Sequence, residues 1–226
     1  MKILAVADEV VPQLQLMEIP ERFRDVDLIL SCGDLPFDYL EYLVTRYNKP
    51  LYYVFGNHGP GDTGTLCADG IAKPAPEGCG NIHRRVVNHK GLLIAGLEGS
   101  LKYNNGPHQY SQRQMRGLIR RMAFTLWRNE RRYGRALDIL ITHAPPWGIH
   151  DEPDLPHQGF EAFLPFIERY QPRYLIHGHI HLYRPDTPRI TKVGETTVIN
   201  AYGYQLLEVD PQQDGPAASS HDTKET

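Results

Sequence analysis

The chain has 226 residues, of which 41% are hydrophobic and 23% charged, enough for one large domain with a substantial core. A formal net charge of −3 gives no global reason to expect nucleic-acid or membrane binding, and no apolar run approaches the roughly 20 residues of a membrane-spanning helix. The three cysteines, Cys32, Cys67 and Cys79, have no CxxC spacing, which is typical of reduced thiols and predicts a cytoplasmic location.

Strand and helix patterns alternate in the first part of the chain. Short apolar runs predict strands at residues 2–7, 26–31 and 50–55, with a helix somewhere within residues 13–23 and another at residues 38–47. This alternation predicts an α/β core with parallel strands.

The remainder of the chain is expected to add further strands and two helices. A loop at residues 59–80 precedes a hairpin of residues 84–88 and 92–97, and residues 98–110 form a second polar loop. Beyond it, the patterns predict helices at 111–133 and 159–170, strands at 137–142 and 173–176, and an antiparallel meander of 190–193, 196–201 and 205–209. Ser111 and Gln114 form a capping box at the start of the first of these helices, and Gly134 ends it. We expect one domain over residues 1–210 and a disordered tail over residues 211–226.

Polar side chains that can bind metals follow five of the predicted strands. They are Asp8, Asp34, Asn57 with His58, His143, and His179 with His181. In an open α/β sheet, ligands bind beyond the carboxyl ends of the strands, so these residues are expected to meet at one edge. A single such residue would be weak support, because Asp and Asn commonly end strands, but the whole set favours a binding site.

The last of these strand ends reads LIHGHIH, residues 175–181, with three histidines at alternate positions. Side chains two apart in an extended segment point the same way, and Gly178 lets the backbone approach a site closely. Any one of these histidines is more often a hydrogen-bonded structural residue, and we expect that role for His177.

Mixed carboxylate, amide and imidazole ligands suit Mn, Fe or Zn better than Ca or Mg. A carboxylate can bridge two cations, and two metals about 3.5–4 Å apart can hold both the attacking and the leaving oxygens of a displacement at phosphorus. A separate protonated histidine could then stabilise charge or protonate the leaving oxygen.

These motifs, in this order, resemble those of the calcineurin-like metallophosphoesterases, over nearly all of residues 1–210. They read ADEV (7–10), CGD (32–34), GNHG (56–59), THAPP (142–146) and GHIH (178–181). The resemblance implies a four-layer αββα sandwich with two mixed β-sheets, and a phosphodiesterase or phosphatase that uses hydroxide bound at a dinuclear metal centre.

The resemblance also assigns roles to the strand-end residues. It implies that Asp34 bridges two divalent metals, that Asp8 and His181 bind the first metal, and that the second is held by Asn57, His143 and His179. His58 would be the catalytic acid or charge stabiliser.

The chain departs from the family pattern at two positions. Val10 stands where the family usually has a metal-ligating histidine, so the first site loses one imidazole, and Glu9 is a candidate replacement ligand. Gly59 stands where an Asp often follows Asn-His and orients that histidine, so His58 needs other support.

The resemblance to metallophosphoesterases predicts that the substrate is a small-molecule or nucleotide phosphate ester, either a diester or a monoester. Besides Asn57 and His58, we expect Tyr103 and Asn104 of the polar loop to contact it, although an ordinary surface connection is an equal alternative for that loop. A non-catalytic binding or scaffold protein on the same fold, with one metal or none, is the alternative that Val10 supports.

Arginines are concentrated on or just past the long predicted helix. They are Arg113, Arg116, Arg120, Arg121, Arg128, Arg131, Arg132 and Arg135. Such a helix can bind nucleic-acid phosphates, but a solvated face paired with carboxylates is the more frequent outcome, so nucleic-acid binding is not expected.

Overall fold

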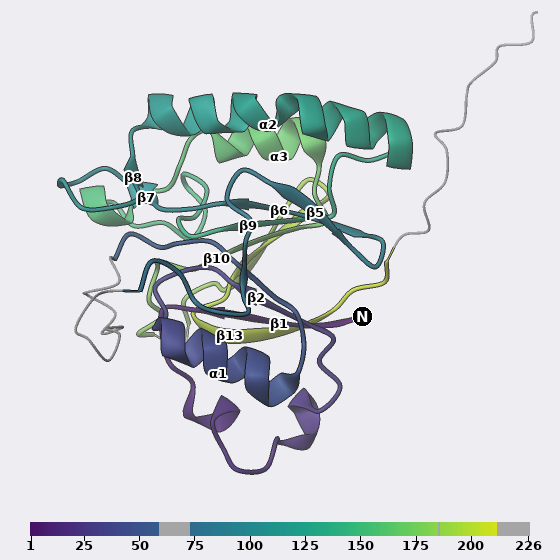
Figure 1. Ribbon diagram of the computed structural model, residues 1–226. Coiled ribbons are helices and arrows are strands. Elements are labelled where there is room, and N and C mark those ends of the chain that lie inside the picture. Colours follow the sequence, from purple (N-terminus) through teal and green to yellow (C-terminus); the bar gives the residue numbers. More distant parts are fainter. Residues whose placement is uncertain (59–72, 185, 212–226) are drawn as a thin grey trace, which may run out of the picture.

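The computed structural model describes residues 1–58, 73–184 and 186–211. Two β-sheets pack face to face, with α1 on the outer side of one sheet and α2 and α3 on the outer side of the other (Figure 1). This is the four-layer α/β arrangement that the family resemblance implies. Within the described residues, no helix is long and apolar enough to cross a membrane.

The first sheet has the strand order β13-β1-β2-β3-β4. Strands β1 to β4 are parallel, and β13 runs antiparallel to β1 along its whole length. The bounds of these strands are β1 Lys2–Ala7, β2 Leu28–Ser31, β3 Leu51–Tyr53, β4 Gly80–Asn81 and β13 Gly203–Glu208.

The second sheet has the order β11-β12-β10-β9-β6-β5, with antiparallel strands only at its two edges. Its strands are β5 Val86–His89, β6 Leu92–Leu97, β9 Ile139–Thr142, β10 Tyr174–His177, β11 Ile190–Val193 and β12 Thr196–Asn200. A short parallel pair, β7 (Ser100–Leu101) and β8 (Gln109–Tyr110), lies within the polar loop predicted at residues 98–110.

In the part of the chain that the structure describes, three α-helices complete the layers: α1 (Phe37–Tyr47), α2 (Gln112–Tyr133) and α3 (Phe163–Tyr170). The capping box predicted for α2 is present, since the Ser111 hydroxyl accepts from the Gln114 backbone and the Gln114 side chain accepts from the Ser111 backbone. Gly134 ends α2 in the left-handed conformation, as expected.

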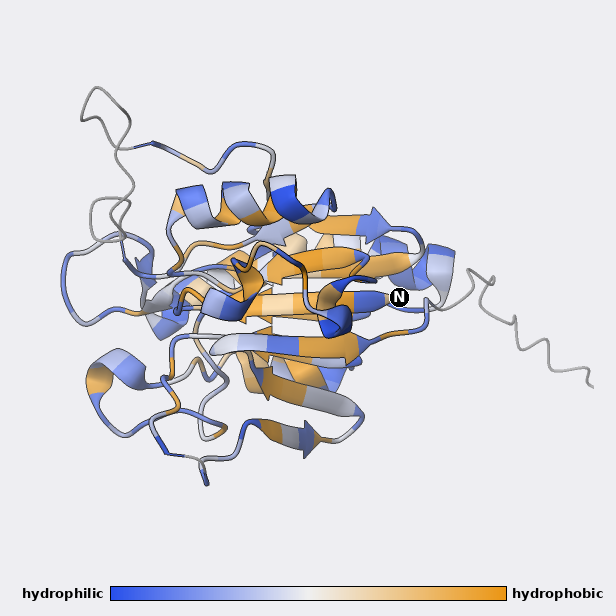
Figure 2. Ribbon diagram, turned by 90° about the horizontal axis from the view of Figure 1, so that it is seen from below, coloured by the Kyte–Doolittle hydropathy of each residue, from blue (hydrophilic) through white to orange (hydrophobic). Residues whose placement is uncertain are grey.

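The residues of the central strands are buried on both faces and divide between apolar layers. Ile3 and Ala5 of β1 face the interior between the two sheets, whereas Leu4 and Val6 pack under α1. In the same way, Leu93 of β6 packs under α2. Seen from below, the strands form a hydrophobic interior behind the polar outer side of the covering helix (Figure 2). This double burial explains why the strands read as continuous apolar runs.

Two predicted elements are wrong. No α-helix forms within residues 13–23, which instead contain single 3₁₀ turns at Pro12–Leu14 and Glu21–Phe23, because the segment buries only Leu14 and Phe23. The last strand, β13, does not continue a meander with β12 but crosses to the other sheet, where it covers the edge of β1. The predicted tail and most of the loop at residues 59–80, including Cys67, lie outside the described residues.

The arginine-rich segment forms the outer surface of the second helical layer. Arg116 pairs with Glu161, and Arg131 lies over the exposed ring of Trp127, which is adjacent to the exposed ring of Phe124. Arg135 lies beyond α2 and binds the buried Asp138 carboxylate at 2.8 Å, so its role is structural.

Parallel strands of both sheets end at the same side of the molecule, opposite the N-terminus in Figure 1. The residues that follow β1, β2, β3, β9 and β10 are therefore delivered to one edge, as predicted.

Candidate metal centre

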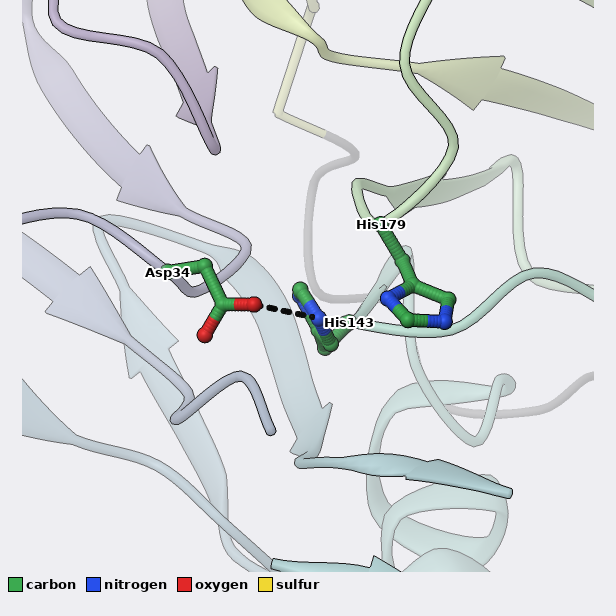
Figure 3. Close-up of side chains that lie close together, drawn as sticks. All are labelled: Asp34, His143 and His179. Carbon is green, nitrogen blue, oxygen red and sulfur yellow. Dashed lines mark ion pairs between the residues drawn. The ribbon is translucent and has the colours of Figure 1, made fainter. Parts of the chain in front are cut away.

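A carboxylate and two imidazoles lie together at this edge (Figure 3). Asp34 follows β2, His143 follows β9 and His179 follows β10, and their potential ligand atoms all lie within 4.8 Å of one another. The first residue comes from one sheet and the other two from the second, so the site spans the junction between the sheets.

The His143 ring is oriented by a backbone carbonyl. Its Nδ1 lies 2.8 Å from the carbonyl oxygen of Cys32, which can only accept, so Nδ1 carries the hydrogen. Its Nε2 faces the cluster, 3.1 Å from Asp34 Oδ2 and 3.0 Å from Asn57 Oδ1. Metal-ligating histidines have the same arrangement, with one nitrogen held by a carbonyl and the other directed at the ion.

The charges of the Asp34–His143 pair stabilise each other. Burial lowers the pKa of His143, but the charge and hydrogen bond of Asp34 outweigh burial and raise that pKa to about 9. Burial likewise raises the pKa of Asp34, yet His143 and the backbone N–H of His58 hold it well below its ordinary value. Without metal, a proton on His143 Nε2 therefore lies among three ligand atoms, and a cation bound by them would take its place.

His179 is oriented in the same way as His143. Its Nε2 lies 2.8 Å from the carbonyl oxygen of Pro156, which leaves Nδ1 as the ligand atom. Burial, reinforced by the charge of His143, lowers the pKa of His179 to about 3, so the ring is neutral and able to bind a metal.

The Asp8 carboxylate completes the buried part of the site. Its side chain is 2% exposed, Oδ1 lies 4.0 Å from His143 Nδ1, and Oδ2 accepts the His179 backbone N–H at 2.9 Å. Burial is the main cause that raises the pKa of Asp8 to about 7, with Asp34 adding to it and His143 opposing it. A bound cation would reverse this shift by stabilising the ionised carboxylate.

The backbone is strained at three of these residues. Asp8, Asp34 and His179 have φ angles of 64°, 55° and 69°, a region that residues other than glycine rarely adopt. A Cβ at Gly56 would overlap the Asp34 carboxylate, so glycine is required there for the close approach. Strain of this kind persists where the surrounding structure imposes it, and it is common at functional sites.

The predicted first-metal side is more open. His181 is exposed, its Nδ1 bonds the Tyr183 hydroxyl at 2.8 Å, and its ring centroid lies 4.7 Å from that of Tyr202. Val10 packs against the apolar layer under α1. Glu9 lines a cavity of about 560 Å³ together with Tyr202.

His58 lies at the rim of the cluster. Its backbone N–H donates to Asp34 Oδ1 at 3.0 Å, and its Nε2 lies 3.9 Å from Asp34 Oδ2, with the side chain 55% exposed. This position leaves the imidazole accessible to a molecule bound at the edge.

The polar loop predicted to shape the substrate site reaches the cluster through Tyr103. The Tyr103 hydroxyl accepts from Asn57 Nδ2 at 3.1 Å, which directs Asn57 Oδ1 toward His143. Asn104 instead bonds within its own loop, to the Gly106 backbone and to Gln109.

Several neighbours of the cluster were not anticipated from the sequence. The ring centroid of His157 lies 5.3 Å from that of His179, and Tyr202 lies against His181. Both come from segments whose return to the site depends on tertiary structure, so spacing along the chain gave no signal for them. His177 is buried and bonds His150 and the Gly178 carbonyl rather than joining the cluster, as predicted.

The donor set fits a divalent metal. Carboxylate oxygens, an amide oxygen and neutral imidazoles converge within a buried space, which is the ligand chemistry of Mn, Fe or Zn. Each imidazole of the cluster already has its second nitrogen held by a carbonyl.

Comparisons with known proteins show the fold and the family of the chain. A UPF0046 protein from Caenorhabditis elegans is 39% identical over 64 residues, which is 28% of this chain and only 21% of that protein's length. The crystal structure of TT1561 from Thermus thermophilus has a TM-score of 0.56 at 17% identity, covering 91% of this chain and 93% of that one. Another crystal structure has a TM-score of 0.59 at 15% identity, covering 95% and 99%. These two structures show a shared fold.

The family model of calcineurin-like phosphoesterases matches residues 1–183, which include every strand-end residue described above. The chain therefore belongs to the calcineurin-like phosphoesterase family.

Proposed function

We propose that the protein is a metal-dependent hydrolase that cleaves a small-molecule or nucleotide phosphate ester at this edge. The observation that carries the proposal is the buried group of Asp34, His143 and His179, with Asn57 and Asp8 beside it and an accessible His58 at its rim. A purely structural metal site would not need an accessible histidine such as His58 at its rim.

Two groups of residues would hold two divalent metals, with Asp34 shared between them. Asn57, His143 and His179 would hold one metal, and Asp8 and His181 the other. Bound there, the metals would supply positive charge for the phosphoryl oxygens and lower the pKa of water.

The chain's own residues would then position the ester and move a proton. Water would attack phosphorus and lose a proton to the solvent, a new P–O bond would form and the P–O bond to the alcohol would break; a proton taken up from the solvent would then restore His58. The His58 imidazolium gives its proton to the departing oxygen, which leaves as the neutral alcohol. The hydrogen bond from the His58 backbone N–H to Asp34 Oδ1 would keep His58 beside the metal positions, although Gly59 supplies no carboxylate to orient its ring.

Tyr103 would act on the reaction through Asn57. Its hydroxyl accepts from Asn57 Nδ2 and so fixes the amide with Oδ1 facing the metal position. Asn104, which bonds within its loop, has no comparable link to the cluster among the described contacts.

The alternative of a binding protein with one metal or none is favoured by two observations on the first-metal side. Val10 packs into an apolar layer, and the side of the site that lacks an imidazole is also the exposed one. Glu9, which shares a cavity wall with Tyr202 next to His181, is our candidate for the missing ligand.

Hydrolysis of bis(p-nitrophenyl) phosphate and of p-nitrophenyl phosphate with added Mn²⁺ tests the proposal, with H58A as the variant. We expect turnover that a chelator abolishes and that H58A lowers by about 10²–10⁴-fold, the usual contribution of a positioned acid. Two bound metals without turnover, together with no effect of H58A, would instead support the binding protein.

A further inference from the structure

A chain of hydrogen bonds ends at the residue before His179. Thr191 Oγ1 lies 2.8 Å from His150 Nε2, His150 Nδ1 lies 2.9 Å from His177 Nε2, and His177 Nδ1 lies 2.9 Å from the Gly178 carbonyl oxygen. These hydrogen bonds connect β11, the loop after β9 and the end of β10.

The positions of the hydrogens follow from the last acceptor. A carbonyl oxygen cannot donate, so His177 Nδ1 carries a hydrogen and Nε2 accepts from His150 Nδ1. His150 Nε2 in turn accepts from the Thr191 hydroxyl. Both rings are neutral in this arrangement, and every nitrogen in it has a partner.

The carbonyl at the end of this chain belongs to a strained turn. The Gly178 oxygen also accepts the Ile180 N–H at 2.8 Å, which closes a γ-turn around His179, where φ is 69°. A γ-turn with positive φ is rare and strained, so it needs support from its surroundings.

The backbone of Gly178 lies among the proposed ligands. Its N–H donates to the His143 carbonyl at 3.0 Å, and a Cβ at Gly178 would lie 2.5 Å from Asp8 Oδ2. A small shift of the Gly178 backbone would therefore displace His179 relative to both Asp8 and His143.

His150 itself is held in an unfavourable backbone conformation, with φ at 62°. Its ring is fixed at both nitrogens, and its partner His177 is fully buried. None of the side chains in this series of hydrogen bonds is one of the proposed metal ligands, so their effect on the metal would have to pass through the Gly178 carbonyl.

We propose that His150 and His177 are positioning residues that hold the γ-turn of His179 in its metal-binding geometry. This inference rests on the proposed function in one respect, namely that the cluster binds a divalent metal. Supporting hydrogen bonds of this kind are typically worth about 10–100-fold in metal affinity.

The test is calorimetric titration of the metal-free protein with Mn²⁺, together with its melting temperature. H150A removes the donor to His177, whereas H150N keeps an N–H near the position of Nδ1 and tolerates the positive φ. T191V removes only the hydrogen bond from the Thr191 hydroxyl to His150 Nε2. H89N is the matched control, because His89 is a buried histidine in β5, at the end of the hairpin remote from the strand-end edge.

We expect H150A to weaken Mn²⁺ binding by about 10–100-fold and H150N to restore most of the affinity. T191V should lie between the wild type and H150A, and H89N should bind as the wild type does. Unchanged affinity in H150A, or an equal loss in H89N at an equal drop in melting temperature, would overturn the inference while leaving the proposed function intact. A wild-type protein that took up no Mn²⁺ would overturn both.

Discussion

His179 and His181 lie two residues apart, yet they occupy different environments. His179 is 7% exposed, its Nε2 is held by the Pro156 carbonyl, and its ring lies 4.7 Å from that of His143. His181 is exposed and has side-chain contacts with Tyr183 and Tyr202. The side of His179 is thus formed by buried residues, whereas the other side combines the buried Asp8 with the exposed His181 and lacks the family's histidine at Val10.

The two proposed metal positions therefore differ in how far their ligand atoms are already in place before a metal binds. On the buried side, Asp34 Oδ2 and Asn57 Oδ1 already lie 3.1 and 3.0 Å from His143 Nε2. On the side of His181, Val10 stands in place of the family's usual imidazole. We therefore expect tight binding on the buried side and weaker binding on the open side.

The largest expected effect comes from D34N. Asp34 is the residue that both sides share, and it is also the partner of His143. We expect loss of metal from both positions and a fall in phosphodiester hydrolysis beyond the about 100-fold that loss of a supporting group causes. Elemental analysis and initial rates measure both effects. Full metal content in D34N would refute the shared role.

H181A should affect only the open side. We expect one metal per chain to be lost while the tighter one remains, with H179A showing the reverse pattern. Metal content per chain after dialysis against low Mn²⁺ measures the difference. Two metals at full occupancy in H181A would show that His181 is not a ligand.

The pH dependence of stability should distinguish the metal-free protein from the loaded one. The folded-state pKa values of Asp8, about 7, and His143, about 9, are raised above their ordinary values of 3.8 and 6.5. The stability that these groups contribute is present below the ordinary values and is lost as pH rises through the folded ones. The depressed pKa values of His177 and His179, about 3, act in the opposite sense up to about pH 6.5, so the melting temperature of the metal-free protein should fall between about pH 7 and pH 9.

Metal binding requires deprotonated ligands, so its affinity should rise over the same interval. Melting curves with and without Mn²⁺ should consequently diverge as pH increases. A metal-free protein whose melting temperature increased steadily from about pH 7 to about pH 9 would contradict the assigned shifts.

The smallest expected effect comes from V10H, which would restore the imidazole that the family usually has. We expect binding at the weaker position to tighten by up to about tenfold, limited by the apolar packing that Val10 now makes. Titration calorimetry against the wild type measures the change, and V10A controls for the lost packing. Identical weak-site affinity in V10H and V10A would mean that Glu9 or another group already fills this position.

The sequence predicted the strand-end residues well because each follows a short apolar run. Asp8, Asp34, His143 and His179 come directly or almost directly after strands, and parallel strands of both sheets end at one edge. The assignment of these residues to particular metals stays a prediction.

The supporting contacts could not be predicted, because they depend on how distant segments return. The Pro156 carbonyl that orients His179 lies 23 residues away, and the His150–His177 contact spans 27 residues. The crossing of β13 to the edge of β1 was missed for the same reason, since a strand pattern does not specify its partner.

Anomalous diffraction from crystals grown with Mn²⁺ would test the central claim most directly. We expect two peaks about 3.5–4 Å apart on either side of the Asp34 carboxylate, the one beside His143 and His179 at higher occupancy. A single peak on the His181 side, or no peak within bonding distance of Asp34, would contradict the account.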